Sequence, residues 1–188
     1  MTKSRPQLIL ITGLPGSGKS TFARALAHAL DLPHYNTDGL RSTLGLRGKY
    51  DTATKDLVYR ELLQRTKEHL VQGESVVIDA TFYSPILRQP FIELANECEA
   101  SAQWIEMEAA EDVIRNRVSF QRPDSEADFS VYLKLKDEYS PPSGPHLVLE
   151  SDRLTLADMV RRAKAYLFPK PKLFLSASNH DLRYAAIS

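Results

Sequence analysis

The chain has 188 residues, 43% of them hydrophobic and 26% charged, a composition typical of one folded domain of about 150 residues. Its 24 Lys and Arg balance 24 Asp and Glu, and this zero net charge argues against a broad nucleic-acid-binding surface. The single cysteine, Cys98, excludes an intramolecular disulfide and predicts a reducing compartment, the cytoplasm. No apolar run approaches the ~20 residues of a membrane span, so we expect no membrane association.

Short apolar segments alternate with helical segments along the chain. The predicted strands are residues 7–12, 32–37, 75–80, 103–107 and 146–150. The predicted helices are residues 19–30, 52–72, 84–100, 111–120, 130–139 and 155–167. Ser84 is expected to cap its helix, with Pro85 in the first turn. The alternation predicts an α/β fold with a five-stranded parallel sheet and helices on both faces.

The segment GLPGSGKS at residues 13–20 matches the phosphate-binding pattern G-x-x-x-x-G-K-[ST] completely. It follows a predicted strand and opens a predicted helix, where backbone N–H groups and the helix N-terminus attract phosphate. Lys19 is expected to reach the β- and γ-phosphates of ATP, and Ser20 to ligate Mg²⁺. The predicted nucleotide-binding residues are Gly13, Leu14, Pro15, Gly16, Ser17, Gly18, Lys19, Ser20 and Thr21.

Asp38 and Arg41 follow the second predicted strand, at the sheet edge where parallel sheets bind ligands. A carboxylate there can orient an acceptor hydroxyl and take its proton. A guanidinium beside it can hold an acidic or phosphorylated acceptor. If a helix begins here, the two side chains share one face. The alternative is that Asp38 only caps that helix.

Asp79 ends the very apolar third strand, where a carboxylate would hold Mg²⁺ directly or through water. Thr81 follows it, and its hydroxyl is placed to contact the acceptor or the γ-phosphate. A cap or turn role for Asp79 is the alternative. Asp38 and Asp79 could exchange the base and metal roles, so both are candidate metal ligands.

Arg115, Arg117 and Arg122 lie between the fourth and fifth strands, in a predicted lid of residues 115–130. On one helix Arg115 and Arg117 point about 200° apart, so at most one of them faces the site. Arg117 and Arg122 are expected to close over the phosphates and stabilise the charge on the transferring phosphoryl group. Ordinary surface arginines are the alternative. The histidines show no ligand spacing, and none is assigned a role.

Together these motifs resemble the P-loop kinases of the zeta-toxin and polynucleotide-kinase type, often labelled AAA-like P-loop kinase domains. The resemblance covers residues 7–168 and includes VVIDAT at 76–81 and RNRVSFQR at 115–122. It implies a P-loop NTPase fold, Asp38 as general base, Arg41 as acceptor or phosphate ligand, and lid arginines at 117 and 122. The chain departs from polynucleotide kinases at Phe82 and Tyr83, where a polar residue is usual. This aromatic pair would stack on a base or sugar, or pack.

We therefore expect an ATP- and Mg²⁺-dependent phosphotransferase that moves the γ-phosphate to a hydroxyl, most simply of a small molecule. The alternatives are a 5′-hydroxyl polynucleotide kinase and a nucleotide-binding regulatory ATPase without an acceptor. Residues 1–168 are expected to form the kinase domain, residues 169–188 a tail or edge element, and the protein a monomer or weak homodimer. Residues 1–50 carry a net charge of +5, 51–114 of −8 and 115–188 of +3, so neutrality conceals a local cationic pocket sized for a polyphosphate.

Overall fold

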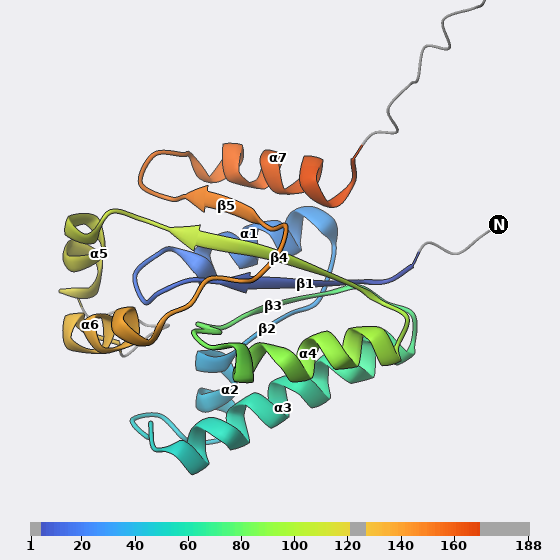
Figure 1. Cartoon of the computed structure of the whole chain (residues 1–188), viewed down its shortest axis with the longest axis horizontal. Helices are drawn as coiled ribbons and strands as arrows, with labels where there is room; N and C mark the ends of the chain where they lie inside the picture. Colours follow the sequence, from blue (N-terminus) through green and yellow to red (C-terminus); the bar gives the residue numbers. More distant parts are fainter. Residues whose placement is uncertain (1–4, 121–126, 170–188) are drawn as a thin grey trace, which may run out of the picture.

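The computed structural model describes residues 5–120 and 127–169 and is built on one parallel sheet (Figure 1). Its strands lie in the order β2-β3-β1-β4-β5, and every neighbouring pair is parallel, as the alternation predicts. The strands are β1 (Gln7–Thr12), β2 (His34–Asn36), β3 (Val76–Asp79), β4 (Ser101–Glu108) and β5 (Leu147–Glu150). The predicted α/β fold class is thus confirmed.

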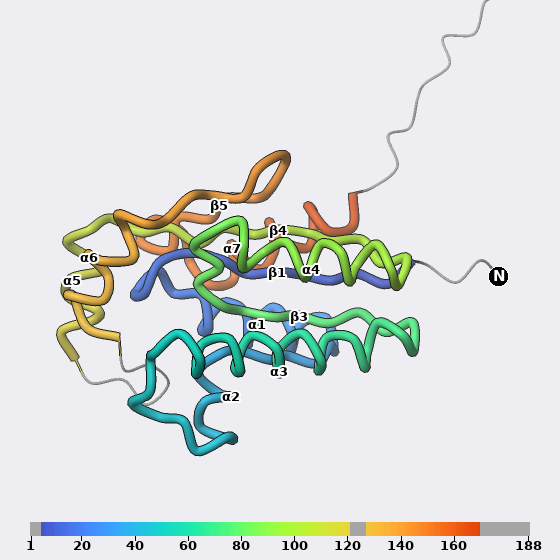
Figure 2. Tube along the Cα trace, turned by 60° about the horizontal axis from the view of Figure 1, so that its bottom comes forward, coloured from blue at the N-terminus to red at the C-terminus, as the bar shows by residue number. Residues whose placement is uncertain are grey.

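Helices cover both faces of the sheet. They are α1 (Lys19–Leu30), α2 (Thr37–Thr43), α3 (Thr52–Val71), α4 (Pro85–Glu97), α5 (Glu111–Val118), α6 (Phe129–Glu138) and α7 (Leu156–Leu167). One face packs on α1 and α7, and the other on α3 and α4, which run side by side (Figure 2). The strand arrows point toward α5 and α6 (Figure 1), so these two helices flank the edge where parallel sheets bind ligands.

The central strand β1 explains why its sequence is apolar without interruption. Successive side chains of a strand point to opposite faces, and this strand is buried on both. Leu8 and Leu10 pack toward α3 and α4, whereas Ile9 and Ile11 pack toward α1 and α7. All four are 0% exposed. Burial of this strand anchors the loop that follows it.

Side chains cap four of the helices, α2, α3, α6 and α7, and fix where they begin. Asp51, Asp128 and Thr155 accept hydrogen bonds from the backbone N–H groups of Thr54, Val131 and Asp158. Ser84 occupies the N-cap position of α4, but its side chain makes no capping hydrogen bond, so that part of the prediction is wrong. Pro85 does open this helix, as predicted.

The predicted strand at 32–37 is partly wrong, because β2 is shorter and Thr37 begins α2. The side chain of Asn36 accepts from the backbone N–H of Gly39 and so starts a helix where the sequence continues an extended pattern. β4 is longer than the predicted 103–107, and α4 ends before residue 100. Residues 121–126 of the predicted lid and 170–188 of the predicted tail lie outside the described residues.

Within the two described ranges, no helix is both long and apolar enough to cross a lipid bilayer.

Candidate active site

The loop between β1 and α1 carries the predicted phosphate-binding motif across the carboxyl edge of the sheet. Its backbone φ angles are 135° at Gly13 and 82° at Gly16, values that glycine adopts readily. A Cβ atom on Gly13 would lie 2.3 Å from the carbonyl oxygen of Met107, and one on Gly16 would lie 2.9 Å from Val118 Cγ1. The glycines therefore allow the loop to run this close to β4 and α5.

Lys19 and Ser20 begin α1 and lie directly after this loop. Lys19 Nζ donates to the carbonyl oxygen of Leu14 at 2.9 Å, so the ammonium group lies over the loop. The Ser20 hydroxyl donates to Asp79 Oδ1 at 2.9 Å. The register of β1 and β3 pairs Ile11 with Asp79 and so brings this carboxylate to the loop. Ser20 and Asp79 together offer the oxygen ligands that Mg²⁺ prefers.

Asp79 has a second partner, His34, which the sequence reasoning missed. His34 Nε2 lies 2.6 Å from Asp79 Oδ2, and the two side chains are 13% and 3% exposed. The contact depends on β2 lying beside β3. The histidine spacing in the sequence gives no signal for this neighbour relation.

α2 carries Asp38 and Arg41 on one side, as expected if a helix begins after β2. Arg41 Nη1 lies 3.4 Å from Asp38 Oδ1, and the guanidinium carbon lies 4.8 Å from the centre of the Tyr50 ring. The alternative that Asp38 caps this helix is wrong, because Asn36 does so. Arg41 is 8% exposed, and within the described part of the chain its Nε has no hydrogen-bond partner. A buried guanidinium with an unpaired N–H is suited to an anionic ligand group.

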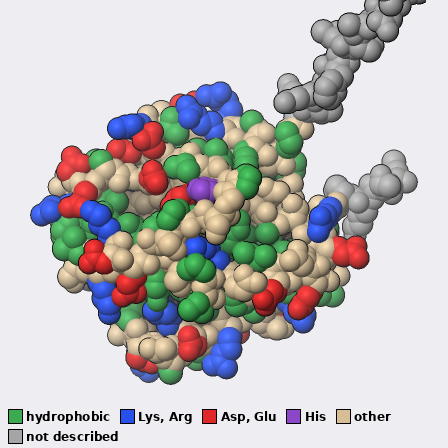
Figure 3. Space-filling model, viewed as in Figure 1, with side chains coloured by type: hydrophobic (Ala, Val, Ile, Leu, Met, Phe, Trp, Pro, Cys, Tyr) green, Lys and Arg blue, Asp and Glu red, His purple; other side chains and the backbone are tan. Residues whose placement is uncertain are grey.

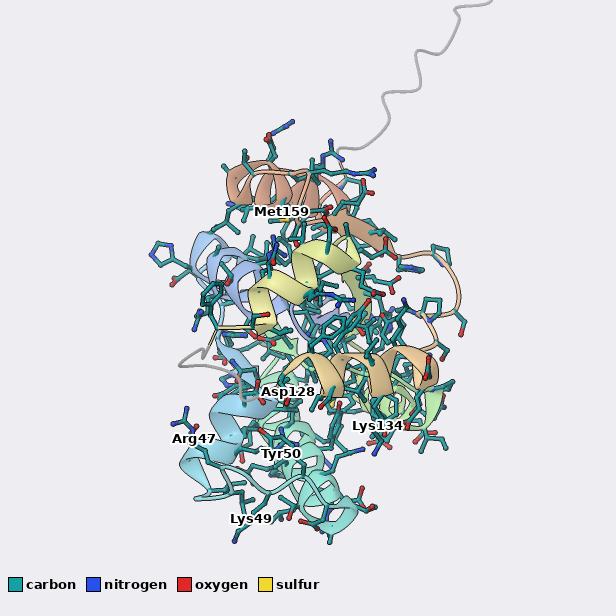
Figure 4. All side chains as sticks on the ribbon, turned by 90° about the vertical axis from the view of Figure 1, so that its left-hand side faces the viewer. Arg47, Lys49, Tyr50, Asp128, Lys134 and Met159 are labelled. Atoms are coloured by element: carbon teal, nitrogen blue, oxygen red, sulfur yellow. The ribbon has the colours of Figure 1, made fainter. Side chains whose placement is uncertain are left out.

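One cavity of about 690 Å³ joins the phosphate loop to α2, α3 and α6. Its lining includes six of the nine predicted nucleotide-binding residues: Pro15, Gly16, Gly18, Lys19, Ser20 and Thr21. On the side of α2, α3 and α6 the lining includes Asp38, Arg41, Tyr50, Lys55, Tyr59, Lys134 and Glu138. In Figure 4, Lys134 lies below α6. Tyr50 lies lower in the same view, in the connection between α2 and α3. The phosphate loop and the predicted acceptor residues thus share one space.

Some of the remaining predicted residues of this region line the cavity, and the others belong to the loop beside it. Thr81 and Asp79 line the cavity, and the carbonyl oxygen of Thr81 accepts from the Thr12 hydroxyl at 2.8 Å. Gly13, Leu14 and Ser17 are the predicted loop residues that, among those described, do not line it. These three residues instead determine the path of the phosphate loop.

Phe82 and Tyr83 have different roles, although the sequence presents them as a pair. Phe82 is fully buried in the core and packs edge-on against Tyr59 and Trp104. Tyr83 lines the cavity, and its hydroxyl accepts from Lys55 Nζ at 2.7 Å. Burial raises the pKa of Tyr59, whose hydroxyl oxygen accepts from the N–H of Phe82 at 3.3 Å. The phenol of Tyr59 therefore stays protonated well above neutral pH.

The predicted lid arginines are placed apart, as their helical spacing requires. Arg117 donates to the carbonyl oxygen of Gly16 at 3.2 Å and to the Ser151 hydroxyl at 2.7 Å, so it supports the phosphate loop from α5. Arg115 points elsewhere, with its guanidinium 4.2 Å from the centre of the Phe129 ring. Arg122 lies outside the described residues. Whether Arg117 or Arg122 stabilises the transferring phosphoryl group stays a prediction.

A second buried polar cluster lies beside the phosphate loop and was also missed. Glu106, 3% exposed and opposite Thr12 in the sheet, accepts from the Tyr139 hydroxyl at 2.5 Å. His146 Nε2 lies 3.1 Å from its other oxygen. Burial and the hydrogen bond to Glu106 raise the pKa of Tyr139. The cluster ties the end of α6 and the start of β5 to β4.

The face of the molecule in Figure 3 carries Lys and Arg side chains interleaved with Asp and Glu. A nucleic-acid-binding face needs a continuous basic surface, because phosphate contacts dominate its affinity. The face in view offers no such surface.

A family model described as "AAA domain" matches residues 8–142. An uncharacterized protein of Mycobacterium tuberculosis is 31% identical over 124 residues, which are 60% of this chain and 25% of that protein. The chain thus spans about a quarter of the length of this relative. An adenylyl-sulfate kinase of Pseudomonas entomophila is 27% identical over 177 residues, which are 90% of this chain and 84% of that protein.

Among solved structures, Kti12 from Chaetomium thermophilum in complex with ADP-AlF3 is similar, with a TM-score of 0.69 and 21% identity over 85% of this chain and 96% of that one. At this identity the similarity shows the fold alone. The narrower resemblance to zeta toxins and polynucleotide kinases stays a prediction.

Proposed function

The chain belongs to the AAA domain family, and on this premise we propose that it is an ATP- and Mg²⁺-dependent phosphotransferase acting on a hydroxyl of a small acidic molecule. The observation that carries the proposal is that the phosphate loop shares one cavity of about 690 Å³ with Asp38 and Arg41. A relative that matches over 90% of this chain is an adenylyl-sulfate kinase, which supports the same class of reaction.

The nucleotide would bind with its phosphates on the loop between β1 and α1. The backbone N–H groups there and the N-terminus of α1 attract negative charge. Lys19, at the start of this helix, supplies a cation for the β- and γ-phosphates. Arg117, bound to the carbonyl oxygen of Gly16, holds the loop in shape.

Ser20 and Asp79 would hold Mg²⁺, since their oxygens lie 2.9 Å apart at the loop. When bound, the ion would neutralise charge on the phosphates. The two oxygens of the Asp79 carboxylate lie within hydrogen-bond distance of Ser20 Oγ and His34 Nε2. These contacts hold the carboxylate in place, which suits a metal ligand. This leaves Asp38, on α2 across the cavity, as the base.

Asp38 would orient the acceptor hydroxyl and accept its proton as the oxygen attacks the γ-phosphorus, with ADP as the leaving group. Its carboxylate is 36% exposed and lines the cavity, so a ligand can reach it. Arg41, 3.4 Å away, lines the same cavity, and its guanidinium would bind an acidic group of the same acceptor. The acceptor would thus carry its hydroxyl and its acid close together.

The walls around Arg41 support a small acceptor. Lys55 and Lys134 add positive charge, and Tyr50 and Tyr83 add flat apolar surface. The sugar or aromatic ring of an acceptor would pack on the tyrosines. Its carboxylate, sulfate or phosphate would pair with the lysines. The interleaved charges on the surface in Figure 3 disfavour a long nucleic acid.

The test is phosphoryl transfer from ATP to matched pairs of hydroxyl compounds, such as glucose with gluconate and adenosine with AMP, followed by ³¹P detection. We expect transfer to an acidic member, and its loss in Asp38→Asn with ATP affinity near that of the wild type. Asp56→Asn, an exposed aspartate on α3, is the matched control. Full transfer by Asp38→Asn would contradict the assigned base. ATP hydrolysis that no acceptor stimulates would favour the regulatory ATPase.

A further inference from the structure

Both oxygens of the Asp79 carboxylate are held, each from a different element. Ser20 Oγ of α1 donates to Oδ1 at 2.9 Å, and His34 Nε2 of β2 lies 2.6 Å from Oδ2. Asp79 is 3% exposed, so these two partners replace most of the water that a carboxylate would otherwise bind. A carboxylate fixed at both oxygens cannot rotate about its Cβ–Cγ bond without losing one of them.

The register of the sheet explains how His34 reaches the carboxylate. Parallel pairing sets His34 opposite Val77 and Asn36 opposite Asp79. Residues two apart share a face of a strand, so Val77 and Asp79 point the same way. The N–H of Val77 donates to the carbonyl oxygen of Pro33 at 3.0 Å and fixes where β2 begins. The imidazole therefore extends along the sheet toward the end of β3.

The chemistry of the pair assigns the donor. An ionised carboxylate can only accept hydrogen bonds, so His34 Nε2 carries the hydrogen that lies between them. His34 does not line the cavity, whereas Asp79 does. We therefore expect His34 to act on a bound ligand through its contact with Asp79.

We propose that His34 is a positioning residue that holds Asp79 in the orientation in which it binds the Mg²⁺ of the nucleotide. The inference rests on the proposed function, in which Asp79 and Ser20 are the metal ligands. Removing a hydrogen-bond partner of a metal ligand typically weakens metal affinity by about 10- to 100-fold. We expect a loss of this size when the donor to Oδ2 is removed, with binding of metal-free nucleotide unchanged.

The experiment compares His34→Gln with His34→Asn and His34→Leu. A glutamine amide can place an N–H near the position of Nε2, whereas an asparagine amide is too short and leucine has no donor. Binding of Mn²⁺ to the full chain saturated with AMPPNP is followed by the loss of the free-ion electron paramagnetic resonance signal. AMPPNP affinity in EDTA and the melting temperature are measured on the same samples. Tyr35→Phe, the next residue of β2, is the matched control and removes the hydrogen bond between the Tyr35 hydroxyl and His69.

We expect Mn²⁺ affinity near the wild-type value in Tyr35→Phe and within about threefold of it in His34→Gln. In His34→Asn and His34→Leu it should fall at least about tenfold. The polar Gln and Asn variants decide the question if His34→Leu does not fold. Equal Mn²⁺ affinity in the Gln and Asn variants would overturn the inference, whether both are normal or both are weak. Absence of Mn²⁺ binding by the wild-type complex would overturn the proposed function as well.

Discussion

The guanidinium of Arg88 donates a hydrogen bond to the carbonyl oxygen of Ser140 at 2.6 Å, so α4 holds the chain just beyond the end of α6. Arg88 is 4% exposed and also donates to the carbonyl oxygens of Phe82 and Pro141, at 2.8 and 3.2 Å. Burial lowers the pKa of its guanidinium, which nevertheless stays charged at neutral pH. One buried cation thus joins the chain that follows β3 to the chain that follows α6.

Arg88→Met should lower the free energy of unfolding by about 3 kcal/mol, because buried carbonyl groups would lose a charged donor. Urea unfolding followed by circular dichroism measures this change. Arg161→Met is the control, since that side chain is 74% exposed and its ion pair with Asp158 should contribute less than about 1 kcal/mol. Equal effects of the two substitutions would show that Arg88 does not anchor the chain.

Stability should fall in alkaline solution. Burial raises the pKa of both Tyr59 and Tyr139 above the ordinary value of 10.0, so the unfolded chain releases these protons first as the pH rises. The free energy of unfolding is therefore unaffected by these groups below about pH 9. Above about pH 10 it declines by about 1.4 kcal/mol per pH unit for each tyrosine. Urea unfolding between pH 8 and 11 measures the slope, which should become shallower in Tyr59→Phe and Tyr139→Phe. An unchanged slope in both would contradict this account.

Gly13→Ala should both destabilise the protein and weaken ATP binding. The new Cβ would meet the Met107 carbonyl oxygen at 2.3 Å, and alanine does not tolerate a φ of 135°. Gly45→Ala is the matched control, because Gly45 also has a positive φ, 68°, but no atom of the described residues lies within 4 Å of its Cβ position. We expect the control to lose about 1 kcal/mol and to bind ATP normally. Calorimetric titration with ATP distinguishes the two variants.

Arg117→Met separates two roles for this side chain. Its hydrogen bonds to Gly16 and Ser151 predict that the phosphate loop becomes less ordered, with ATP affinity reduced by about tenfold. A residue that acts on the transferring phosphoryl group would instead lower the transfer rate and leave ATP affinity unchanged. Arg115→Met, on the same helix and 59% exposed at its side chain, is the control. Normal ATP binding by Arg117→Met would contradict the supporting role.

The strands and most helices could be predicted because local patterns determine them. Uninterrupted runs such as Leu8 to Ile11 require burial on both faces, and the glycine-rich loop has a specific backbone form. The ends of elements were less predictable, since α2 begins through one Asn36 hydrogen bond. Only a small free energy separates a helix that begins at such a cap from a strand that continues past it.

The parts of the site that could be predicted are those formed by residues close together in the sequence. Lys19 and Ser20 belong to a recognisable motif, and Asp38 and Arg41 lie three residues apart. His34 and Arg88 could not be found in this way, because their partners are distant in the sequence. His34 reaches Asp79 across 45 residues, and Arg88 reaches Ser140 across 52. Only the order of the strands and the packing of α4 reveal these contacts.

Much of the acceptor side of the cavity comes from one uninterrupted stretch, residues 37–59, which supplies Asp38, Arg41, Tyr50, Lys55 and Tyr59. The phosphate side comes from the loop between β1 and α1, from α1 and from the end of β3. Replacing that stretch as a cassette would exchange most of the surface that selects an acceptor and leave the ATP side in place. A chain arranged in this way can acquire a new substrate through a single recombination event, and protein engineers can use the same two boundaries.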